Sequence, residues 1–326
     1  MPEMPTSRRS FLRKAAVTAA AAGCLPSDAT APAAAEDPAE KTHPIRLGGP
    51  VFGASQDPEE LALAHKKLGY RAGYCPAVKL GDQQRIGDIA AAFAKHDVVI
   101  AEVGRWCNLL DTDAAKRAAN LKTVAEGLAL AEAVGARCCV DIAGSFNPTV
   151  WYGPHPDNLS PRFFDAVVEN ARKIIDAVKP KRAKFSYEMM GWALPDSADS
   201  YLQMIRAVDR EAFAVHLDPC NLINSPARFY RNTDVLNECF DKLGRWIVSC
   251  HAKDLVWNVE MNVHFREVCI GAGSLDYTTY LKRLAALAGD VPLMIEHMKD
   301  AAEYDKSRQH LFQLGEKIGV GFGYCV

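Results

Sequence analysis

The chain has 326 residues, of which 49% are hydrophobic and 24% are charged, a balance typical of a globular domain with one large core. Its formal net charge of -2 gives no electrostatic reason to expect nucleic acid as a partner, because nucleic-acid-binding proteins usually carry a basic patch. We therefore predict a single catalytic domain whose partner is a small molecule.

The first 36 residues are predicted to be an export signal that is not part of the fold. The sequence from Ser7 to Leu12 reads SRRSFL, a twin-arginine (Tat) pattern, and the apolar run after it is too short to span a bilayer. We expect export to the periplasm without a membrane span. The sequence leaves two ways of processing this signal open. Cleavage after the alanines at 33–35 would release a soluble protein, whereas Cys24, in a lipoprotein-like box, would carry a lipid anchor.

From residue 37 onward, short apolar runs alternate with segments whose apolar residues recur at helical spacing. Such apolar runs are typical of parallel strands that are buried on both faces. Strands are predicted at residues 45–49, 70–75, 98–103, 137–142, 184–188, 213–218, 246–251 and 291–296. Helices are predicted between them, including 58–68, 82–95, 113–134 and 161–178, with a last helix at about 302–318.

This alternation predicts an α/β fold, a (β/α)8 TIM barrel, rather than an open doubly wound sheet. No glycine-rich nucleotide motif opens a predicted helix, which disfavours a dinucleotide-binding fold. We therefore predict one TIM-barrel catalytic domain over residues 37–326. A homo-oligomer of this domain is compatible with the sequence.

The last four predicted strands end in side chains that can bind a metal. They close on Glu188 in RAKFSYE, Asp218 in AFAVHLD, His251 in WIVSCH and Glu296 in VPLMIE. The intervals between these residues each match one β/α unit, the last enlarged by a loop. Because functional side chains of a (β/α)8 barrel lie at the C-terminal ends of the strands, we expect the four to converge.

The same segments resemble a known family. FSYEMMGW, VHLDPCN, CHAKD, GAGSLDY and PLMIEHM resemble the xylose-isomerase-like barrel superfamily, usually labelled sugar phosphate isomerase/epimerase, from about residue 45 to the C-terminus. IAEVGRWCN and DIAGSFN are similar to one bacterial branch of it. The resemblance implies a single divalent metal held by Glu188, Asp218, His251 and Glu296. It also implies that Glu188 and Glu296 are catalytic and exchange a proton between the two faces of the substrate.

The chemistry of these ligands indicates the ion and the reaction. Three carboxylates and one imidazole form a mostly oxygen site, which favours Mn or Mg and tolerates Co, Fe or Zn. A metal that chelates a ketone oxygen and the neighbouring hydroxyl stabilises the enediolate that forms when the carbon-bound proton leaves. We therefore predict a metal-dependent isomerase or epimerase that acts on a polyhydroxylated carbonyl compound, a sugar or cyclitol derivative.

Other functions are open at this point. A lyase or dehydratase would use the same enediolate to expel a β-hydroxyl from a keto-sugar or ketocyclitol. It needs a general acid, for which His216, His264 and Lys253 are candidates. A non-catalytic periplasmic carbohydrate-binding protein is a weaker alternative. An endonuclease is disfavoured, because few of the nine histidines lie near the ligand-bearing strand ends.

Several residues near the ligands are predicted to bind the substrate. His216 lies two residues before Asp218 on one strand and should face the same interior. Asn221 stands where ketose 3-epimerases of the superfamily carry a histidine. Leu194 and Trp257 stand where those epimerases carry an acid and an arginine. These departures put a free-ketose epimerase in doubt but leave the metal ligands unchanged.

Five further residues complete the predicted substrate contacts. Lys253 is placed to neutralise an oxyanion, and Trp106 with Asn108 is placed to form a sugar-stacking wall after the third strand. Residues 255–273 are predicted to be a lid, with His264 or Arg266 contacting the substrate.

The fourth strand offers additional but less definite candidates. Trp151 and His155 follow this strand and would extend the wall. The directions of Glu102 and Asp141 are left open, because the register of a buried strand is not determined by its sequence.

Overall fold

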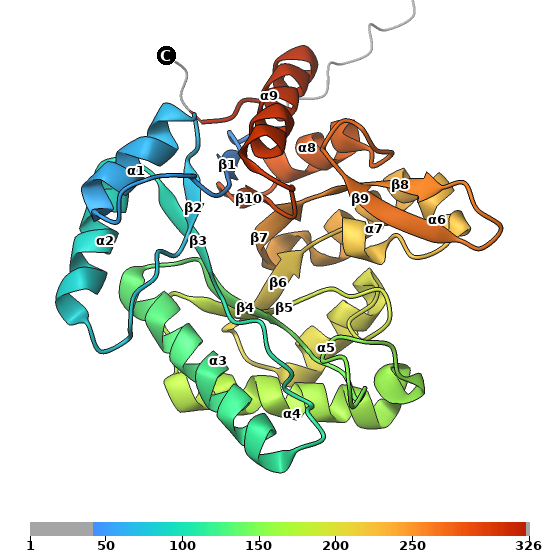
Figure 1. Cartoon of the computed structure of the whole chain (residues 1–326). Helices are drawn as coiled ribbons and strands as arrows, with labels where there is room; N and C mark the ends of the chain where they lie inside the picture. Colours follow the sequence, from blue (N-terminus) through green and yellow to red (C-terminus); the bar gives the residue numbers. More distant parts are fainter. Residues whose placement is uncertain (1–41, 324–326) are drawn as a thin grey trace, which may run out of the picture. The chain divides into compact units, whose positions relative to one another are not determined.

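The computed structural model describes residues 42–323, so the twin-arginine pattern, the cleavage site and Cys24 lie outside the described residues and export remains a prediction. The barrel strands are β1 (Arg46–Gly48), β2 (Ala72–Tyr74), β3 (Val99–Gly104), β4 (Cys138–Ile142), β5 (Lys184–Glu188), β6 (Phe213–Leu217), β7 (Ile247–Ala252) and β10 (Pro292–Ile295). They close into a parallel barrel in the order β1-β10-β7-β6-β5-β4-β3-β2 (Figure 1). The predicted (β/α)8 TIM barrel is confirmed.

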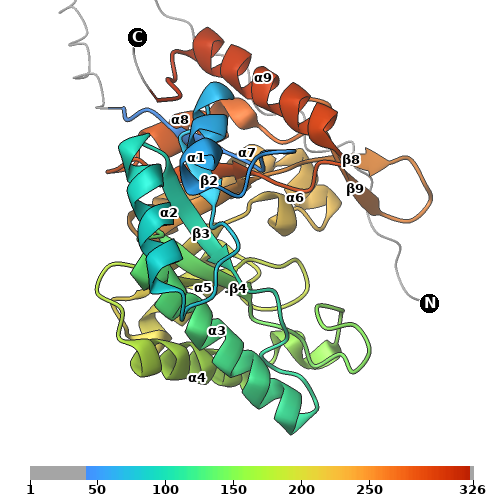
Figure 2. The ribbon, with the colours of Figure 1, turned by 60° about the vertical axis from the view of Figure 1, so that its left-hand side comes forward.

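Helices fill the connections and surround the barrel (Figures 1 and 2). They are α1 (Pro58–Lys67), α2 (Gln83–Lys95), α3 (Ala114–Val134), α4 (Pro161–Val178), α5 (Ala198–Val208), α6 (Pro226–Tyr230), α7 (Asn232–Leu243), α8 (Tyr277–Ala285) and α9 (Ala301–Ile318). Side chains determine where several of them begin: Asp57, Asp113 and Ser160 each accept hydrogen bonds from N–H groups of the first turn. Within residues 42–323, no helix is both long and apolar enough to cross a membrane.

The segment predicted as a lid forms a hairpin instead of a loop. Strands β8 (Asp254–Asn258) and β9 (His264–Val268) pair antiparallel, and the hairpin projects from the barrel beside α6 (Figure 1). Trp257 and Phe265 are cross-strand partners, and the ring of Phe265 stacks on Phe229 with a centroid distance of 5.3 Å. This aromatic packing gives the segment the side-chain contacts that a stable strand pair needs.

Asp254 anchors the base of this hairpin. Its side chain is buried, Oδ2 accepts hydrogen bonds from the N–H groups of Gly271 and Gly273, and Oδ1 accepts one from Leu275. A Cβ atom at Gly273 would lie 2.0 Å from Asp254 Oδ1, so the close approach requires glycine there. Asp254 therefore holds the GAGS turn and leaves the neighbouring Lys253 to face the barrel interior.

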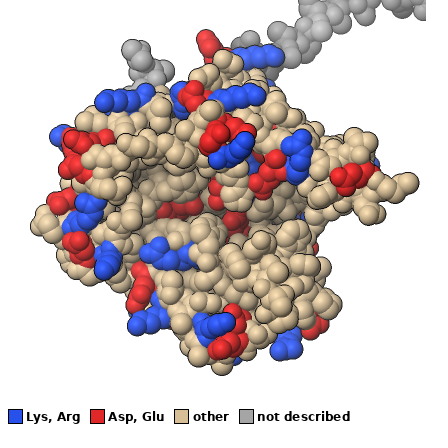
Figure 3. Space-filling view, viewed as in Figure 1, with Lys and Arg blue, Asp and Glu red and all other residues tan. Residues whose placement is uncertain are grey.

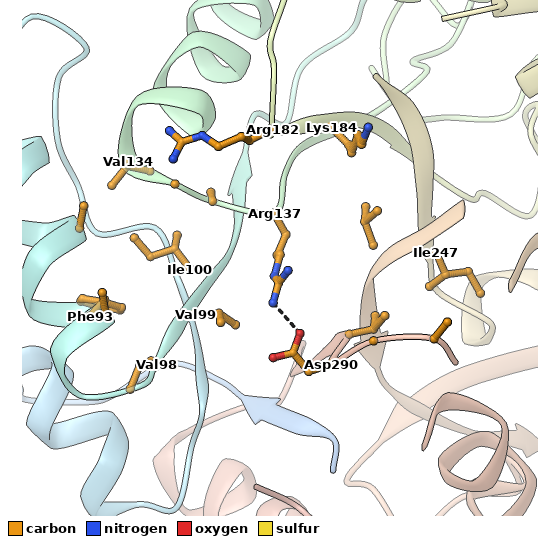
Figure 4. Close-up of a pocket in the computed structure, with 18 residues that line it drawn as sticks. Phe93, Val98, Val99, Ile100, Val134, Arg137, Arg182, Lys184, Ile247 and Asp290 are labelled. Atoms are coloured by element: carbon orange, nitrogen blue, oxygen red, sulfur yellow. Dashed lines mark hydrogen bonds and ion pairs between the residues drawn. The ribbon is translucent and has the colours of Figure 1, made fainter. Parts of the chain in front are cut away.

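A cavity of about 680 Å³ lies at the N-terminal end of the strands. Its lining is largely apolar, with Val99 and Ile247 at the first positions of their strands. Figure 4 shows Arg137 pointing across this cavity to Asp290, with which it forms an ion pair of 2.7 Å. Because this end of a (β/α)8 barrel serves stability and its cations are paired, we place the functional site at the opposite end.

Candidate metal centre

Four side chains from neighbouring strands meet at the C-terminal end of the barrel. Glu188 is the last residue of β5, Asp218 follows β6, His251 lies on β7 and Glu296 follows β10. These strands are consecutive in the barrel order. One ligand atom from each residue lies within 4.8 Å of the others. The structure thus brings together the four ligands that the sequence predicts.

The donor atoms point at one another from buried positions. His251 Nδ1 lies 2.9 Å from Glu296 Oε2 and 3.3 Å from Glu188 Oε1. Asp218 Oδ2 and Glu296 Oε2 are buried oxygens that lie 2.6 and 2.7 Å from the ammonium of Lys253. Buried carboxylate oxygens require a cation or a hydrogen-bond donor of this kind. The donor set of three carboxylates and one imidazole nitrogen fits a divalent cation.

Lys253 supplies a positive charge inside this cluster. Its side chain is 2% exposed, and Nζ lies 2.6 Å from Asp218 Oδ2, 2.7 Å from Glu296 Oε2 and 3.2 Å from Glu188 Oε1. Burial alone would lower the pKa of Lys253, but the three carboxylates raise this pKa well above its usual value. The three carboxylates outnumber this ammonium, so the cluster keeps an excess of negative groups that a bound divalent cation would offset.

The two predicted catalytic glutamates are held ionised. Burial would raise the pKa of Glu188, but Lys253 and His251 outweigh it and hold this pKa well below its usual range. The pKa of Glu296 is lowered to about 2, because His251 and Lys253 again outweigh the effect of burial. A carboxylate must be ionised to bind a metal or to accept a proton, so both groups are in the required state.

A second buried cluster lies behind His251 and involves a residue that the sequence did not assign to the site. Glu102 on β3 points into the barrel, where Oε1 lies 3.2 Å from His251 Nε2. Its Oε2 lies 2.9 Å from His216 Nε2 and accepts a hydrogen bond of 3.2 Å from the Ser249 hydroxyl. The direction of Glu102 was left open by the sequence and is decided here by the register of β3.

His216 belongs to this deeper cluster and not to the cavity. Its side chain is fully buried, and its ring lies 4.1 Å from the His251 ring, centroid to centroid. Two residues along a strand span about 6.6 Å, so His216 faces the same interior as Asp218 but lies one layer lower. His216 is not among the residues that line the cavity. In this arrangement it is therefore not positioned to make the direct substrate contact that the sequence analysis predicted.

Two asparagines that were predicted to bind the substrate form hydrogen bonds with protein groups around the site instead. Asn221, predicted to bind the substrate, donates hydrogen bonds to Glu188 Oε1 at 3.0 Å and to the Met189 carbonyl at 3.1 Å. Asn108, also predicted to bind it, is buried, donates to the Ser145 carbonyl and accepts from the N–H groups of Ser145 and Leu110. Asn221 therefore orients a ligand, and Asn108 joins the loops that follow β3 and β4.

The remaining predicted substrate residues divide between cavity and hairpin. Trp106 is 43% exposed, lines the cavity, and its ring centroid lies 6.5 Å from that of His251. His264 is exposed on the hairpin and pairs with Glu260 at 3.5 Å. Arg266, also on the hairpin, donates a hydrogen bond to Asn258. The structure thus brings Trp106 to the ligands and leaves His264 and Arg266 apart from them.

The cavity at this end has a volume of about 1020 Å³. Its lining includes Tyr74, Glu102, Glu296 and His297, and Figure 3 shows acidic side chains on the floor of a hollow in this face. A space of this size is ample for a sugar-sized ligand.

His297 is a second cavity residue that the sequence analysis did not select. It has a φ of 60°, unusual for a residue other than glycine. Its Nδ1 lies 2.9 Å from Glu267 Oε2 on β9, and this hydrogen bond raises the pKa of His297. Its position directly after Glu296 was the signal available in the sequence.

Comparisons with known proteins agree with the fold. A family model described as xylose isomerase-like TIM barrel matches residues 64–314 of the chain. No curated protein sequence matches the chain significantly.

Solved structures share the fold at low sequence identity. A xylose isomerase domain protein from Planctomyces limnophilus has a TM-score of 0.62 at 18% identity, over 86% of this chain and 99% of that chain. A xylose isomerase-like TIM barrel protein from Mycobacterium smegmatis in complex with magnesium has a TM-score of 0.59 at 17% identity, over 84% and 97%. A D-psicose 3-epimerase in the presence of D-fructose has a TM-score of 0.59 at 14% identity, over 84% and 99%.

Proposed function

The chain belongs to the xylose isomerase-like TIM barrel family, and from this membership we propose that it is a divalent-metal-dependent isomerase or epimerase of a sugar or cyclitol derivative. The observation that carries the proposal is the convergence of Glu188, Asp218, His251 and Glu296 at the C-terminal end of the barrel. The magnesium complex and the D-psicose 3-epimerase among the structures of the same fold support the ion and the substrate class. The oxygen-rich donor set favours Mn²⁺ or Mg²⁺.

We propose separate roles for the two glutamates. A divalent ion bound by the four ligands would acidify the proton on the carbon next to a substrate carbonyl. Glu296 lines the cavity and is 17% exposed at its side chain, which supports it as the residue that accepts this proton. Glu188 is 6% exposed and comes from the other end of the arc of four strands, so it, or a water, returns a proton from the other side.

Lys253 and Asn221 keep this arrangement in place. The ammonium of Lys253 contacts all three carboxylates and offsets their mutual repulsion. Asn221 donates to Glu188 Oε1, which fixes the orientation of that carboxylate. The two side chains therefore hold the ligands in position before the substrate enters.

The lyase alternative depends on a general acid near the leaving group. Of the three candidates from the sequence, His216 lies behind the ligands, His264 lies on the hairpin, and Lys253 lies among the carboxylates. Lys253 is already engaged by three anions, so we favour isomerisation or epimerisation over elimination. Formation of an enone absorbance during turnover would instead identify a lyase.

The proposal is tested by metal analysis and by solvent deuterium. The purified chain, supplied with Mn²⁺ and freed of excess ion, is expected to retain one divalent ion per chain. Incubation in D₂O with a panel of keto sugars and ketocyclitols is expected to introduce deuterium next to the carbonyl, measured by mass spectrometry. Absence of bound metal would contradict the four-ligand site and favour a carbohydrate-binding protein. Turnover without exchange would indicate a hydride shift.

Replacing Trp106 tests the predicted sugar-stacking wall. Trp106→Ala is expected to raise KM by up to about tenfold with a smaller change in kcat, because an aromatic face contributes roughly 0.5–1.5 kcal/mol to such packing. Steady-state kinetics on the substrate identified by deuterium exchange measures both constants. Tyr230→Ala, at an exposed aromatic of α6 that is not part of the cavity lining, is the control. An unchanged KM in the Trp106 variant would remove this residue from the substrate site.

A further inference from the structure

Glu102 reaches the metal centre from the far side of the barrel. In the strand order, β3 and β7 lie four positions apart in the eight-membered ring and are therefore on opposite sides. Glu102 nevertheless contacts His251 and Ser249 on β7 and His216 on β6. Its side chain is 1% exposed. It therefore crosses the barrel axis directly beneath the proposed metal centre.

Glu102 faces the outer nitrogen of His251. An ionised carboxylate can only accept hydrogen bonds, and Glu102 Oε1 lies 3.2 Å from His251 Nε2. The other nitrogen, Nδ1, lies 2.9–3.8 Å from oxygens of Glu188, Asp218 and Glu296. A divalent ion bound among these oxygens would take the lone pair of Nδ1 and leave the one ring proton on Nε2, facing Glu102.

Three groups converge on the Glu102 carboxylate. Its oxygens lie 3.2 Å from His251 Nε2 and 2.9 Å from His216 Nε2, and Oε2 accepts a hydrogen bond of 3.2 Å from the Ser249 hydroxyl. These contacts hold the carboxylate in one orientation, with Oε1 toward His251.

We propose that Glu102 is a positioning residue that holds the Nε2 side of His251 and fixes the orientation of its ring, so that Nδ1 would be presented to the divalent ion. This inference rests on the proposed metal site. Hydrogen bonds from the outer nitrogen of a metal-binding histidine typically change metal affinity by about 10–100-fold. The residue acts on the metal site through its contact with His251.

A second metal site is the alternative to a positioning role for Glu102. Glu102, His216 and His251 have ligand atoms within 4.8 Å of one another and would form a second metal site if His251 bridged two ions. The hydrogen bonds favour positioning, because both carboxylate oxygens already have donors and Ser249 supplies one of them. The two arrangements differ in the number of ions bound per chain.

The test measures the affinity and stoichiometry of Mn²⁺ binding by calorimetric titration of the full chain without substrate. Glu102→Gln keeps the shape of the side chain but removes its charge and one acceptor, and is expected to weaken Mn²⁺ binding by about 10–100-fold. The control is Glu132→Gln, which changes an ionised carboxylate of α3 that accepts from the N–H groups of Arg182 and Ala183. This control is expected to bind Mn²⁺ within about threefold of wild type.

Each outcome separates this inference from the proposed function. Wild-type affinity in Glu102→Gln, with one ion per chain, would overturn the role of Glu102 and leave the metal site intact. Two ions per chain, reduced to one in the variant, would establish the second metal site instead. A wild-type chain that binds no Mn²⁺ would overturn both proposals.

The imidazole nitrogen resonances of the wild-type chain loaded with diamagnetic Mg²⁺ provide an independent measurement if the Glu102 variant does not fold. Nitrogen-15 NMR distinguishes a protonated from an unprotonated ring nitrogen. We expect His251 with a proton on Nε2 and none on Nδ1. The opposite tautomer would overturn the proposal.

Discussion

Glu296→Gln is expected to lower the rate of deuterium exchange next to the substrate carbonyl by about 10²–10⁴-fold, the usual contribution of a general base. Glu296 lines the cavity, is ionised, and its carboxylate lies 2.9 Å from His251 Nδ1. The glutamine amide retains an oxygen that can bind the ion but cannot accept a proton at neutral pH. The variant should therefore keep bound metal while it loses exchange.

The measurement pairs exchange with metal content in the same protein sample. Glu169→Gln, on the exposed face of α4 where Glu169 pairs with Lys173, serves as the matched control and should exchange at the wild-type rate. Exchange at that rate in Glu296→Gln, with metal present, would exclude Glu296 as the base and direct attention to Glu188. Loss of both metal and exchange would identify Glu296 as an indispensable ligand without testing its role as a base.

Lys253→Met is expected to lower the free energy of unfolding of the metal-free protein by about 3–5 kcal/mol, the usual cost of removing one partner from a buried ion pair. Lys253 is 2% exposed and contacts Glu188, Asp218 and Glu296. Without its charge, three buried carboxylates repel one another with only His251 left to offset that repulsion. Saturating Mn²⁺ should restore much of the lost stability, because an ion that binds only the folded state stabilises it.

Urea denaturation in EDTA and again in Mn²⁺ measures both effects. The control is Lys184→Met, which removes a lysine whose partner Glu211 is fully exposed at 3.9 Å. Solvent screens such a pair, so the control should unfold close to the wild type. If metal-free Lys253→Met is as stable as the wild type, Lys253 does not neutralise the ligand cluster.

Both predictions depend on the charge of the site, which the sequence indicated only in part. The ligands were identified as strand ends, whereas the contact of Lys253 with three of them follows from the fold. Asp254, the next residue, illustrates the difference. The two are neighbours in CHAKD, yet Asp254 braces the turn at Gly273 and Lys253 enters the cluster.

The barrel and the convergence of four metal-capable side chains at its strand ends were both predictable from the amino-acid sequence. Both depend on signals that are local along the chain: apolar runs at regular intervals, each followed by a carboxylate or an imidazole. Parallel strands that close into a barrel place their carboxyl ends at one face. Glu188, Asp218, His251 and Glu296 were therefore predictable as a group.

The side chains that support these four residues could not be predicted, because they come from distant parts of the chain. Glu102 meets His251 across the barrel, Asn221 turns to Glu188, and residues 254–268 pair as a hairpin against α6. His264 and Arg266 are carried away from the ligands by that pairing. Contacts of this kind depend on strand order, register and barrel closure, and a one-residue change of register would turn Glu102 outward. The spacing of residues along the chain does not contain that information.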